Sequence, residues 1–146
     1  MKKTGFIVLF FSAVLVAEAQ FRKIPADVTD AFLSRYPHAM HVAWKDKLHY
    51  FEASFKLNEC TITAIFSSKG EWQGSERELI FNQLPTEVKD GFMKSKYAER
   101  QKNTVYEVQE LGKPLQYRIN VQKSGLQKKN LYFDVNGKLL KESIVL

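Results

Sequence analysis

Apolar residues recur along the chain with two periods, first that of a helix and then that of a strand, and this order occurs twice. After each proline the apolar positions are four residues apart, as on one face of an α-helix. They are Ile24, Val28, Phe32 and Tyr36 in the first stretch and Leu84, Val88 and Phe92 in the second. The spacing predicts two amphipathic helices, each with one apolar stripe that packs against a sheet.

Prolines mark the ends of these helices. Pro25 and Pro85 fit the first helical position, where the missing N–H costs nothing. Pro37 ends the first helix, because proline disfavours a helical conformation in the residue before it. The second helix has no such stop, and we expect it to continue to about Gln101.

Alternating apolar and polar residues follow each helix and predict four strands in each half. Glycine turns at Lys69–Gly70 and Asn136–Gly137 separate strands, and Asn-Gly is a strong hairpin signal. The short connections favour antiparallel neighbours. The expected strands are His41–Lys45, Leu48–Leu57, Glu59–Ser67 and Glu71–Ile80, then Asn103–Glu110, Pro114–Gln122, Gln127–Val135 and Lys138–Val145.

The two halves also correspond at their helices. Ile24–Leu33 matches Leu84–Met93 in its apolar positions, its proline and its first-turn acid. The sequence therefore predicts an α+β fold of two tandem units, each a helix plus a four-stranded antiparallel sheet, with the helices packed on one face. We place the units at residues 20–82 and 83–146. No flexible Gly/Ser linker joins them, so we expect one globular body.

Residues 1–19 have the pattern of a secretory signal peptide. Lys2 and Lys3 precede an apolar run from Phe6 to Ala17, and an Ala-Glu-Ala cleavage site completes the pattern. The run has twelve residues and as a helix would span only about 18 Å, which is too short for a membrane anchor. We expect a periplasmic or secreted protein of a Gram-negative bacterium, with no transmembrane segment after cleavage.

Cysteine content and net charge limit how the fold is held together and which classes of partner are expected. Cys60 is the only cysteine, so no internal disulfide holds the domain, and its place on a strand face predicts a small buried side chain. A net charge of +6 fits either an ordinary solvated surface or a weak contact with an anionic surface. Export argues against a nucleic-acid partner. We expect Trp44 and Trp72 in the core rather than at a contact.

No pattern indicates catalysis, a metal site or a cofactor. The sequence has no HExxH, GxSxG, phosphate-loop or CxxC motif. His38 and His41 follow Pro37 without a carboxylate that would complete a zinc site. Glu76 and Glu78 share one face of a polar strand, which we interpret as a charged edge that prevents aggregation. We therefore expect a protein that is not an enzyme and carries no cofactor.

The polar faces of the strands form the candidate binding surface. An antiparallel sheet with helices on one side leaves its other face in water, where aromatic and arginine side chains suit protein recognition. A plain solvated sheet is the alternative, and a shift of one residue in a strand would exchange its two faces. The candidate partner-binding residues are Tyr50, Glu52, Lys56, Arg118, Asn120 and Tyr132.

Several motifs, in this order, resemble the PepSY-like, beta-lactamase-inhibitor-protein-like family of small exported bacterial proteins. They are the Ile24-Pro25 and Leu84-Pro85 helix starts, Tyr36-Pro37-His38-Ala39, Trp44 and Phe66–Trp72. The resemblance implies tandem helix-plus-four-strand units whose sheets form a continuous or nearly continuous curved surface. It also implies a binding or inhibitory role without catalysis.

The leading hypothesis is a non-enzymatic periplasmic binding module that recognises a protein or peptide through the exposed sheet face. A proteinaceous inhibitor of a secreted hydrolase or peptidase is an alternative, which a panel of exported enzymes would reveal. A protein held at the envelope by charge is another, and its liposome binding would fall with salt. An enzyme whose site is assembled from distant residues also stays open, and turnover on a substrate panel would show it.

Overall fold

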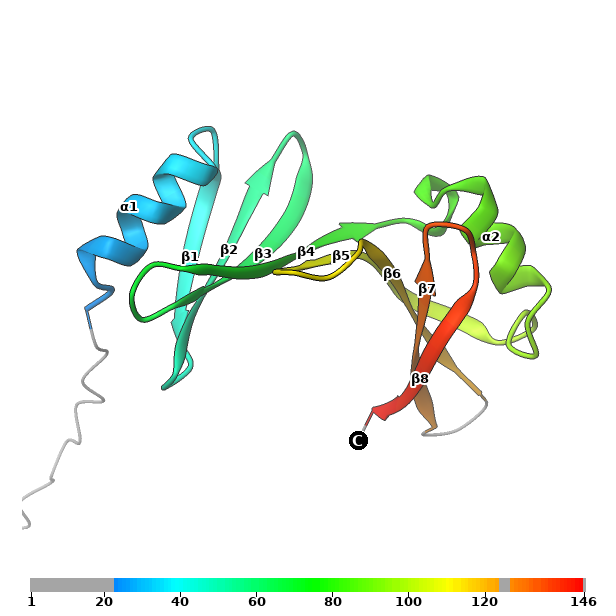
Figure 1. Ribbon diagram of the computed structural model, residues 1–146. Coiled ribbons are helices and arrows are strands. Elements are labelled where there is room, and N and C mark those ends of the chain that lie inside the picture. The colour runs from blue at the N-terminus through cyan, green and yellow to red at the C-terminus, as the bar shows by residue number, and fades with distance from the viewer. Residues whose placement is uncertain (1–22, 124–126, 146) are drawn as a thin grey trace, which may run out of the picture.

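The computed structural model describes residues 23–123 and 127–145, and the expected signal peptide at residues 1–19 lies outside them. Within these residues the chain forms two α-helices, eight strands and a short 3-10 helix (Figure 1). The elements are α1 (Ala26–Arg35), β1 (Met40–Asp46), β2 (Tyr50–Leu57), β3 (Cys60–Ser67), β4 (Trp72–Leu79), η1 (Phe81–Gln83), α2 (Thr86–Met93), β5 (Gln101–Glu110), β6 (Gln116–Gln122), β7 (Lys128–Asp134) and β8 (Leu139–Val145). A helix followed by four strands therefore occurs twice in the element order.

The eight strands form one antiparallel sheet in which spatial order follows sequence order, from β1 to β8. Strands β4 and β5 pair along their length, from Gly74 opposite Glu110 to Leu79 opposite Val105. This pairing joins the two halves. The fold is thus α+β with a single eight-stranded sheet, rather than two separate four-stranded sheets.

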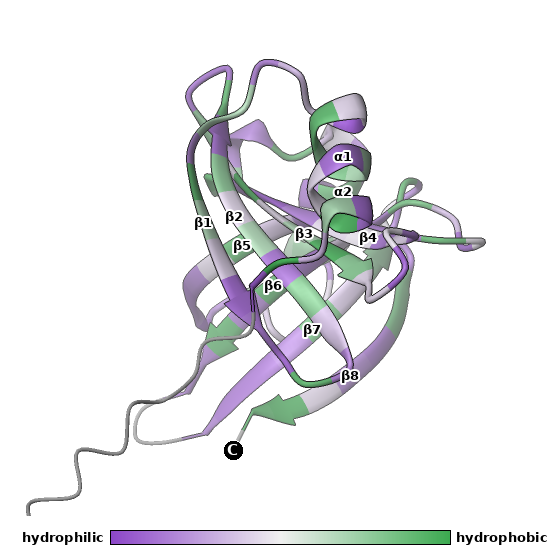
Figure 2. Cartoon of the chain, turned by 90° about the vertical axis from the view of Figure 1, so that its left-hand side faces the viewer, coloured by the Kyte–Doolittle hydropathy of each residue, from purple (hydrophilic) through white to green (hydrophobic). Residues whose placement is uncertain are grey.

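Both helices lie on the same side of this sheet. Directly opposed residues of neighbouring strands share a face, and one such row runs through Ile62, Arg77, Glu107, Tyr117 and Phe133. Its first residue packs in the core under α1 and its last in the core under α2. Figure 1 shows the two helices near opposite ends of the sheet, and in Figure 2, turned by 90°, they lie one behind the other. The opposite face, called the open face below, is covered by no helix of the described residues.

Each helix has its own hydrophobic core. On α1, Val28 and Phe32 are buried, and the Phe32 ring lies edge-on to Phe55 at 5.1 Å and to Trp44 at 5.2 Å. Trp72 also packs against this core, so both tryptophans lie where we expected them. The core under α2 shares no described residue with the first and contains Leu84, Val88, Phe92, Tyr97, Val105, Tyr117, Ile119, Val121, Leu131 and Phe133. The halves therefore meet through the sheet rather than through a common core.

The helix starts are one residue later than predicted. Pro25 and Pro85 are N-cap residues with ψ of 148°, and each helix begins at the next residue. The end of α1 at Arg35 agrees with the prediction. Tyr36 has φ −128° and ψ 62° because the ring of Pro37 excludes a helical conformation there.

The second helix ends much earlier than predicted. It stops at Met93, and the expectation of a helix as far as Gln101 is wrong. Ser95 is the cause, because its Oγ donates to the carbonyl oxygen of Phe92 at 2.6 Å and accepts the N–H of Tyr97 at 3.2 Å. A serine hydroxyl that bonds nearby backbone in this way competes with helical hydrogen bonds. The chain then turns and brings the Tyr97 ring into the core.

The β3–β4 and β7–β8 turns rest on the first turns of the helices. Gly70 and Gly137 have φ of +81° and +80°, in the left-handed region that favours glycine. A Cβ atom would lie 2.4 Å from the carbonyl oxygen of Asp27 at Gly70, and 2.0 Å from that of Glu87 at Gly137. Glycine at these turns thus lets the sheet and the helices approach closely.

Two interpretations of the first half are wrong. Strand β4 lies between β3 and β5, so Glu76 and Glu78 are in the interior of the sheet rather than on an edge strand. The neighbour that covers β4 comes from the second half of the chain, beyond a whole helix, so the local sequence does not reveal it. Cys60 is partly exposed rather than buried, because it directly follows the turn at Asn58 and Glu59.

Candidate binding surface

The open face collects side chains from all eight strands. On β2 and β3, buried residues on the helix side alternate with partly exposed residues on the open face. Its charged residues are the five cations Lys45, Lys56, Arg118, Lys128 and Lys141 and the five anions Glu52, Glu76, Glu78, Glu110 and Asp134. Neither sign of charge dominates the face as a whole.

All six predicted contact residues lie on the open face, but in two separate groups. The group on β2 is Tyr50, Glu52 and Lys56, and the group on β6 and β7 is Arg118, Asn120 and Tyr132. The structure places Arg118 directly opposite Tyr132. Strands β3, β4 and β5 separate the two groups, so the six residues do not form one cluster. Their role in binding is a proposal that is argued below.

A row of stacked side chains crosses the second half of the open face. The register places Glu78, Tyr106, Arg118, Tyr132 and Lys141 directly opposite one another on β4 to β8. The Arg118 guanidinium carbon lies 4.6 Å from the centre of the Tyr106 ring, and Lys141 Nζ lies 4.2 Å from that of Tyr132. Cation–π attraction stabilises such stacking. We call Tyr106, Arg118, Tyr132 and Lys141 the aromatic–cation row.

Arg118 anchors this row to the first half of the chain. Its Nη1 and Nη2 donate to Glu76 Oε1 and Oε2 at 2.5 and 2.7 Å, which is a bidentate ion pair. Burial acts to lower the pKa of Arg118, but hydrogen bonding to Glu76 and its charge, followed by hydrogen bonding to Tyr132, raise this pKa overall. The guanidinium is therefore a fixed positive charge.

Carboxamide side chains form a second ladder beside this row. Asn103 Nδ2 donates to Asn120 Oδ1 at 2.9 Å, and Asn120 Nδ2 donates to Asn130 Oδ1 at 2.8 Å. Asn103 Nδ2 also donates to Gln122 Oε1 at 3.3 Å. These bonds order the amides, whose remaining donors and acceptors suit polar recognition.

A hollow lies on the open face where the two halves join. Gly74 has no side chain to fill it, and Ile65 and Val108 are among the residues that line a volume of about 230 Å³. The glycine is required by the β4–β5 pairing, since a Cβ there would lie 2.8 Å from the carbonyl oxygen of Gln109. The hollow could therefore receive a small apolar group of a partner.

A second ion pair spans the joint on the helix side. Arg77 Nε and Nη2 donate to Glu107 Oε1 and Oε2 at 3.1 and 2.9 Å, and hydrogen bonding to this carboxylate raises the pKa of Arg77. The Tyr117 hydroxyl donates to Glu107 at 3.5 Å, and burial followed by the negative charge of Glu107 raises the pKa of Tyr117. Glu76 and Arg77 are adjacent on β4. Side chains of this strand therefore form ion pairs with the second half of the chain on both faces of the sheet.

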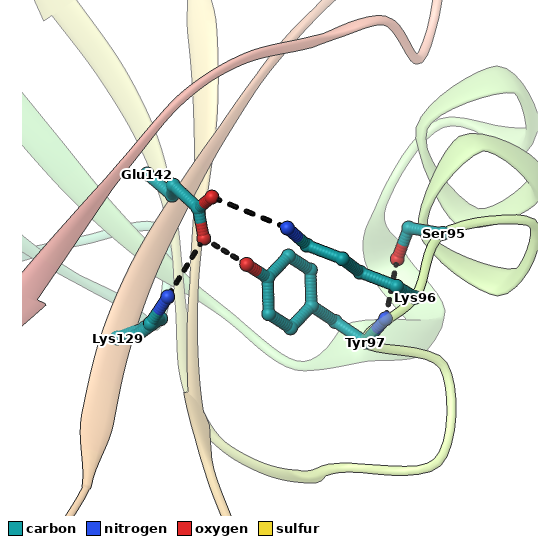
Figure 3. A network of polar contacts seen from close by, with 5 residues as sticks. All are labelled: Ser95, Lys96, Tyr97, Lys129 and Glu142. Atoms are coloured by element: carbon teal, nitrogen blue, oxygen red, sulfur yellow. Dashed lines mark hydrogen bonds and ion pairs between the residues drawn. The ribbon is translucent and has the colours of Figure 1, made fainter.

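A third polar cluster fixes the last strand (Figure 3). The buried Tyr97 donates its hydroxyl to Glu142 of β8, which also accepts from Lys129 at 3.0 Å and from Lys96 at 3.4 Å. Glu142 is opposite the buried Leu131, so the cluster lies on the helix side. Its groups satisfy one another, and we assign them the structural role of holding β8 against the segment that follows α2.

Gly74, Tyr106, Val108, Lys128 and Lys141 are among the residues of this surface that sequence reasoning missed. In β5, apolar side chains occupy both phases of the alternation, with Val105 on the helix side and Tyr106 and Val108 on the open face. The alternation along β5 therefore does not show which of its residues face the helices. The usable signal was Gly74, because a glycine inside a strand marks a close backbone approach.

The described residues form neither a cluster that could hold a metal ion nor a helix that could cross a membrane. In residues 23–123 and 127–145, no group of three His, Cys, Asp or Glu side chains is placed to hold a metal ion. His38, His41 and His49 are exposed to solvent. No helix in the described part of the chain has the length and apolar character needed to cross a membrane.

These features define a small α+β protein with an open antiparallel sheet. The chain belongs to the PepSY-like family, described as "Putative beta-lactamase-inhibitor-like, PepSY-like", whose model matches residues 49–141. The match confirms the resemblance that the sequence motifs carry. A comparison with curated proteins found no match.

Solved structures of Bacteroides proteins have a similar fold. A BLIP-like protein from Bacteroides fragilis has a TM-score of 0.81 at 26% identity, over 86% of this chain and 89% of that one. A DUF2874 family protein from Bacteroides ovatus has a TM-score of 0.80 at 27% identity, over 84% and 88%. A protein from Bacteroides eggerthii, described among "putative periplasmic proteins", has a TM-score of 0.78 at 23% identity, over 84% and 89%.

Proposed function

We propose that this protein is a non-enzymatic periplasmic binding module that recognises a protein or peptide through the open face. The observation that carries the proposal is a sheet face eight strands wide that no helix of the described residues covers. Seven inter-strand spacings of about 4.8 Å make it roughly 34 Å across. A standard interface needs about 800 Å² on each partner, which such a face can supply.

The contact residues belong to the two groups on this face, together with the row between β5 and β8. We propose contacts from Tyr50, Glu52, Lys56, Arg118, Asn120 and Tyr132, and we add Tyr106 because it stacks on Arg118. Stacking and bidentate pairing hold Tyr106, Arg118 and Tyr132 in place before a partner arrives. Binding then costs little side-chain entropy, which favours affinity.

Capture from an envelope extract tests this function. The chain from residue 20 is immobilised, and retained proteins are compared between two double variants by mass spectrometry. Tyr132→Ala with Asn120→Ala should abolish retention, whereas Leu33→Ala with Met93→Ala, both exposed on the helices, should leave it unchanged. Both variants must keep the circular dichroism spectrum of the parent. Retention that is lost only with the helix variant would refute the open face as the site.

We further propose that the two halves are tandem units at residues 20–82 and 83–146, and that residues 1–19 are a signal peptide removed on export. The repeated element order supports the first proposal, as do the corresponding glycines Gly70 and Gly137 over the helix starts. N-terminal sequencing of protein recovered from the periplasm would test the second. It should begin at Gln20.

Inhibition of a secreted hydrolase or peptidase is the second candidate function. The family description favours it, as does the likeness to a BLIP-like protein. An inhibitor would use the same open face to cover an active site. It should lower the activity of an exported enzyme at a one-to-one ratio, and the Tyr132→Ala and Asn120→Ala double variant should not. A panel of exported enzymes from the same bacterium that all keep full activity would count against this candidate.

A further inference from the structure

We infer that the β7–β8 end of the open face binds an extended acidic segment of the partner, with carboxylates placed on Lys141 and Lys128. This inference rests on the proposed function and specifies the chemistry of the partner. It follows from an asymmetry between the halves, from the state of the exposed groups and from the distribution of unpaired charge.

Equivalent rows in the two halves carry different side chains. In the second half, β5 to β8 contribute the aromatic–cation row. In the first half, β1 to β4 contribute one residue each to the corresponding row, which is Lys45, Glu52, Ile65 and Gly74. The row of the first half ends at Gly74, where the hollow lies, whereas the row of the second half ends at Lys141. A row that ends in a lysine without an ion-pair partner among the described residues is therefore specific to the second half, because Lys45 of the first row pairs with Glu52.

The stacking determines which chemical groups of the aromatic–cation row a partner can contact. Arg118 lies over the Tyr106 ring and Lys141 over the Tyr132 ring, so cations of the protein itself occupy a face of each ring. A sugar that needs a free aromatic face is disfavoured. Beside the stacked rings, the row carries phenolic hydroxyl and ammonium donors. The matching partner group is an acceptor, best a carboxylate.

Charge at this end of the face is positive despite the balance over the whole. Four of the five acids on the open face are already bonded: Glu52 to Lys45, Glu76 to Arg118, Glu110 to Lys113, and Asp134 to the N–H groups of Asn136 and Lys138. Lys128 and Lys141 are exposed, and neither forms an ion pair with another described residue. On β7 and β8 the charge without an ion-pair partner is therefore cationic, whereas the other exposed charges outside the ion pairs of this face, Lys56 on β2 and Glu78 on β4, stand singly.

The register fixes the spacing that a partner must match. Lys141 is opposite Tyr132 and Lys128 is opposite Val145, four residues apart along the strands. At about 3.3 Å per residue, the two lysines are about 13 Å apart along the sheet. Two acidic residues at positions i and i+4 of an extended segment span the same distance and project from one face of it.

An NMR titration of the ¹⁵N-labelled chain from residue 20 tests this inference. The probe is acetyl-Ser-Glu-Thr-Ser-Thr-Glu-Ser-amide, with its glutamates at i and i+4. The expected shifts centre on Lys128, Tyr132 and Lys141, and Lys128→Gln with Lys141→Gln should weaken binding about tenfold, as two lost charge contacts imply. The matched control, Lys45→Gln with Lys56→Gln on the first half, should bind the probe like the parent.

Four results would overturn the inference. One is equal binding of the peptide in which both glutamates are replaced by glutamine, and another is a set of shifts centred away from β7 and β8. The third is binding of phosphatidylglycerol vesicles that needs Lys128 and Lys141 without binding of the peptide, which would assign this end to a lipid surface. Partner capture that survives Lys128→Gln with Lys141→Gln would contradict the inference while leaving the proposed function intact.

Discussion

Two adjacent residues of β4 couple the halves of the molecule. Glu76 points to the open face and pairs with Arg118, while Arg77 points to the helix side and pairs with Glu107. Because successive residues of a strand face opposite sides, one dipeptide holds the second half from both faces. The cores do not meet, so these pairs and the β4–β5 hydrogen bonds form the joint.

Removing Arg118 should destabilise the protein through the carboxylate that it leaves behind. The Glu76 side chain is only 31% exposed, so Arg118→Ala should lower the free energy of unfolding by about 2 kcal/mol, since a partly buried charge loses its partner. Urea unfolding followed by tryptophan fluorescence measures this change. Adding Glu76→Gln should recover part of it.

The control for this prediction is a pair that is exposed on both sides, Lys94 and Asp90 at α2. Their side chains are 76% and 58% exposed. Lys94→Ala should therefore change stability by less than about 0.5 kcal/mol, as is usual for surface pairs. Equal losses for the two variants would show that Arg118 is only a surface charge.

At the scale of elements, each helix is positioned by the glycine turn below it. In the second half the contact is closer, because a Cβ at Gly91 of α2 would lie 1.9 Å from the carbonyl oxygen of Gly137. The corresponding position of α1 is Ala31. The helix α2 thus sits on its turn with no space for a methyl group.

Gly91→Ala should therefore destabilise the protein although alanine is the better helix former. The gain in helix propensity is about 1 kcal/mol, whereas forcing a methyl group into a packed contact costs up to about 3 kcal/mol. We expect a net loss of about 2 kcal/mol in thermal or urea unfolding. Gly112→Ala is the control, because its φ is +71° but no atom lies within 4 Å. It should cost only about 1 kcal/mol of backbone strain, and a larger loss there than at Gly91 would contradict this account.

Most elements were predictable because local patterns determine them. The strands begin and end within two residues of the expected positions, since alternation and glycine turns fix them. The end of α2 was not predictable from periodicity, because the Ser95 hydroxyl bonds the carbonyl oxygen of Phe92 and the N–H of Tyr97 where a further helical turn was expected. The place of β4 inside the sheet depends on pairing with β5, which the sequence of either strand alone does not encode.

The candidate site was only partly predictable for the same reason. Polar residues of β2, β6 and β7 alternate clearly with buried ones, so their face could be assigned. The face on which Tyr106 lies could not be assigned from the sequence, because β5 carries apolar side chains on both faces. The aromatic–cation row exists only through the register between four strands, and that register arises from tertiary pairing.

At the scale of the whole molecule, a single sheet separates a structural side from an open side. The helix side holds both cores and the cluster around Tyr97 and Glu142. The open face holds the hollow over Gly74, the aromatic–cation row and the amide ladder. Polar groups ordered before binding, on a face that no helix of the described residues covers, are the physical basis for assigning recognition to this side.

Masking one face at a time tests this assignment most directly. In a Cys60→Ser background, Asn120→Cys places a thiol on the open face and Leu33→Cys places one on the outer side of α1, where Leu33 is exposed. Each thiol is coupled to a bulky polyethylene glycol maleimide, and capture from the envelope extract is measured before and after coupling. The account predicts that coupling at residue 120 abolishes capture and that coupling at residue 33 leaves it unchanged. Capture that survives at residue 120 but is lost at residue 33 would contradict it.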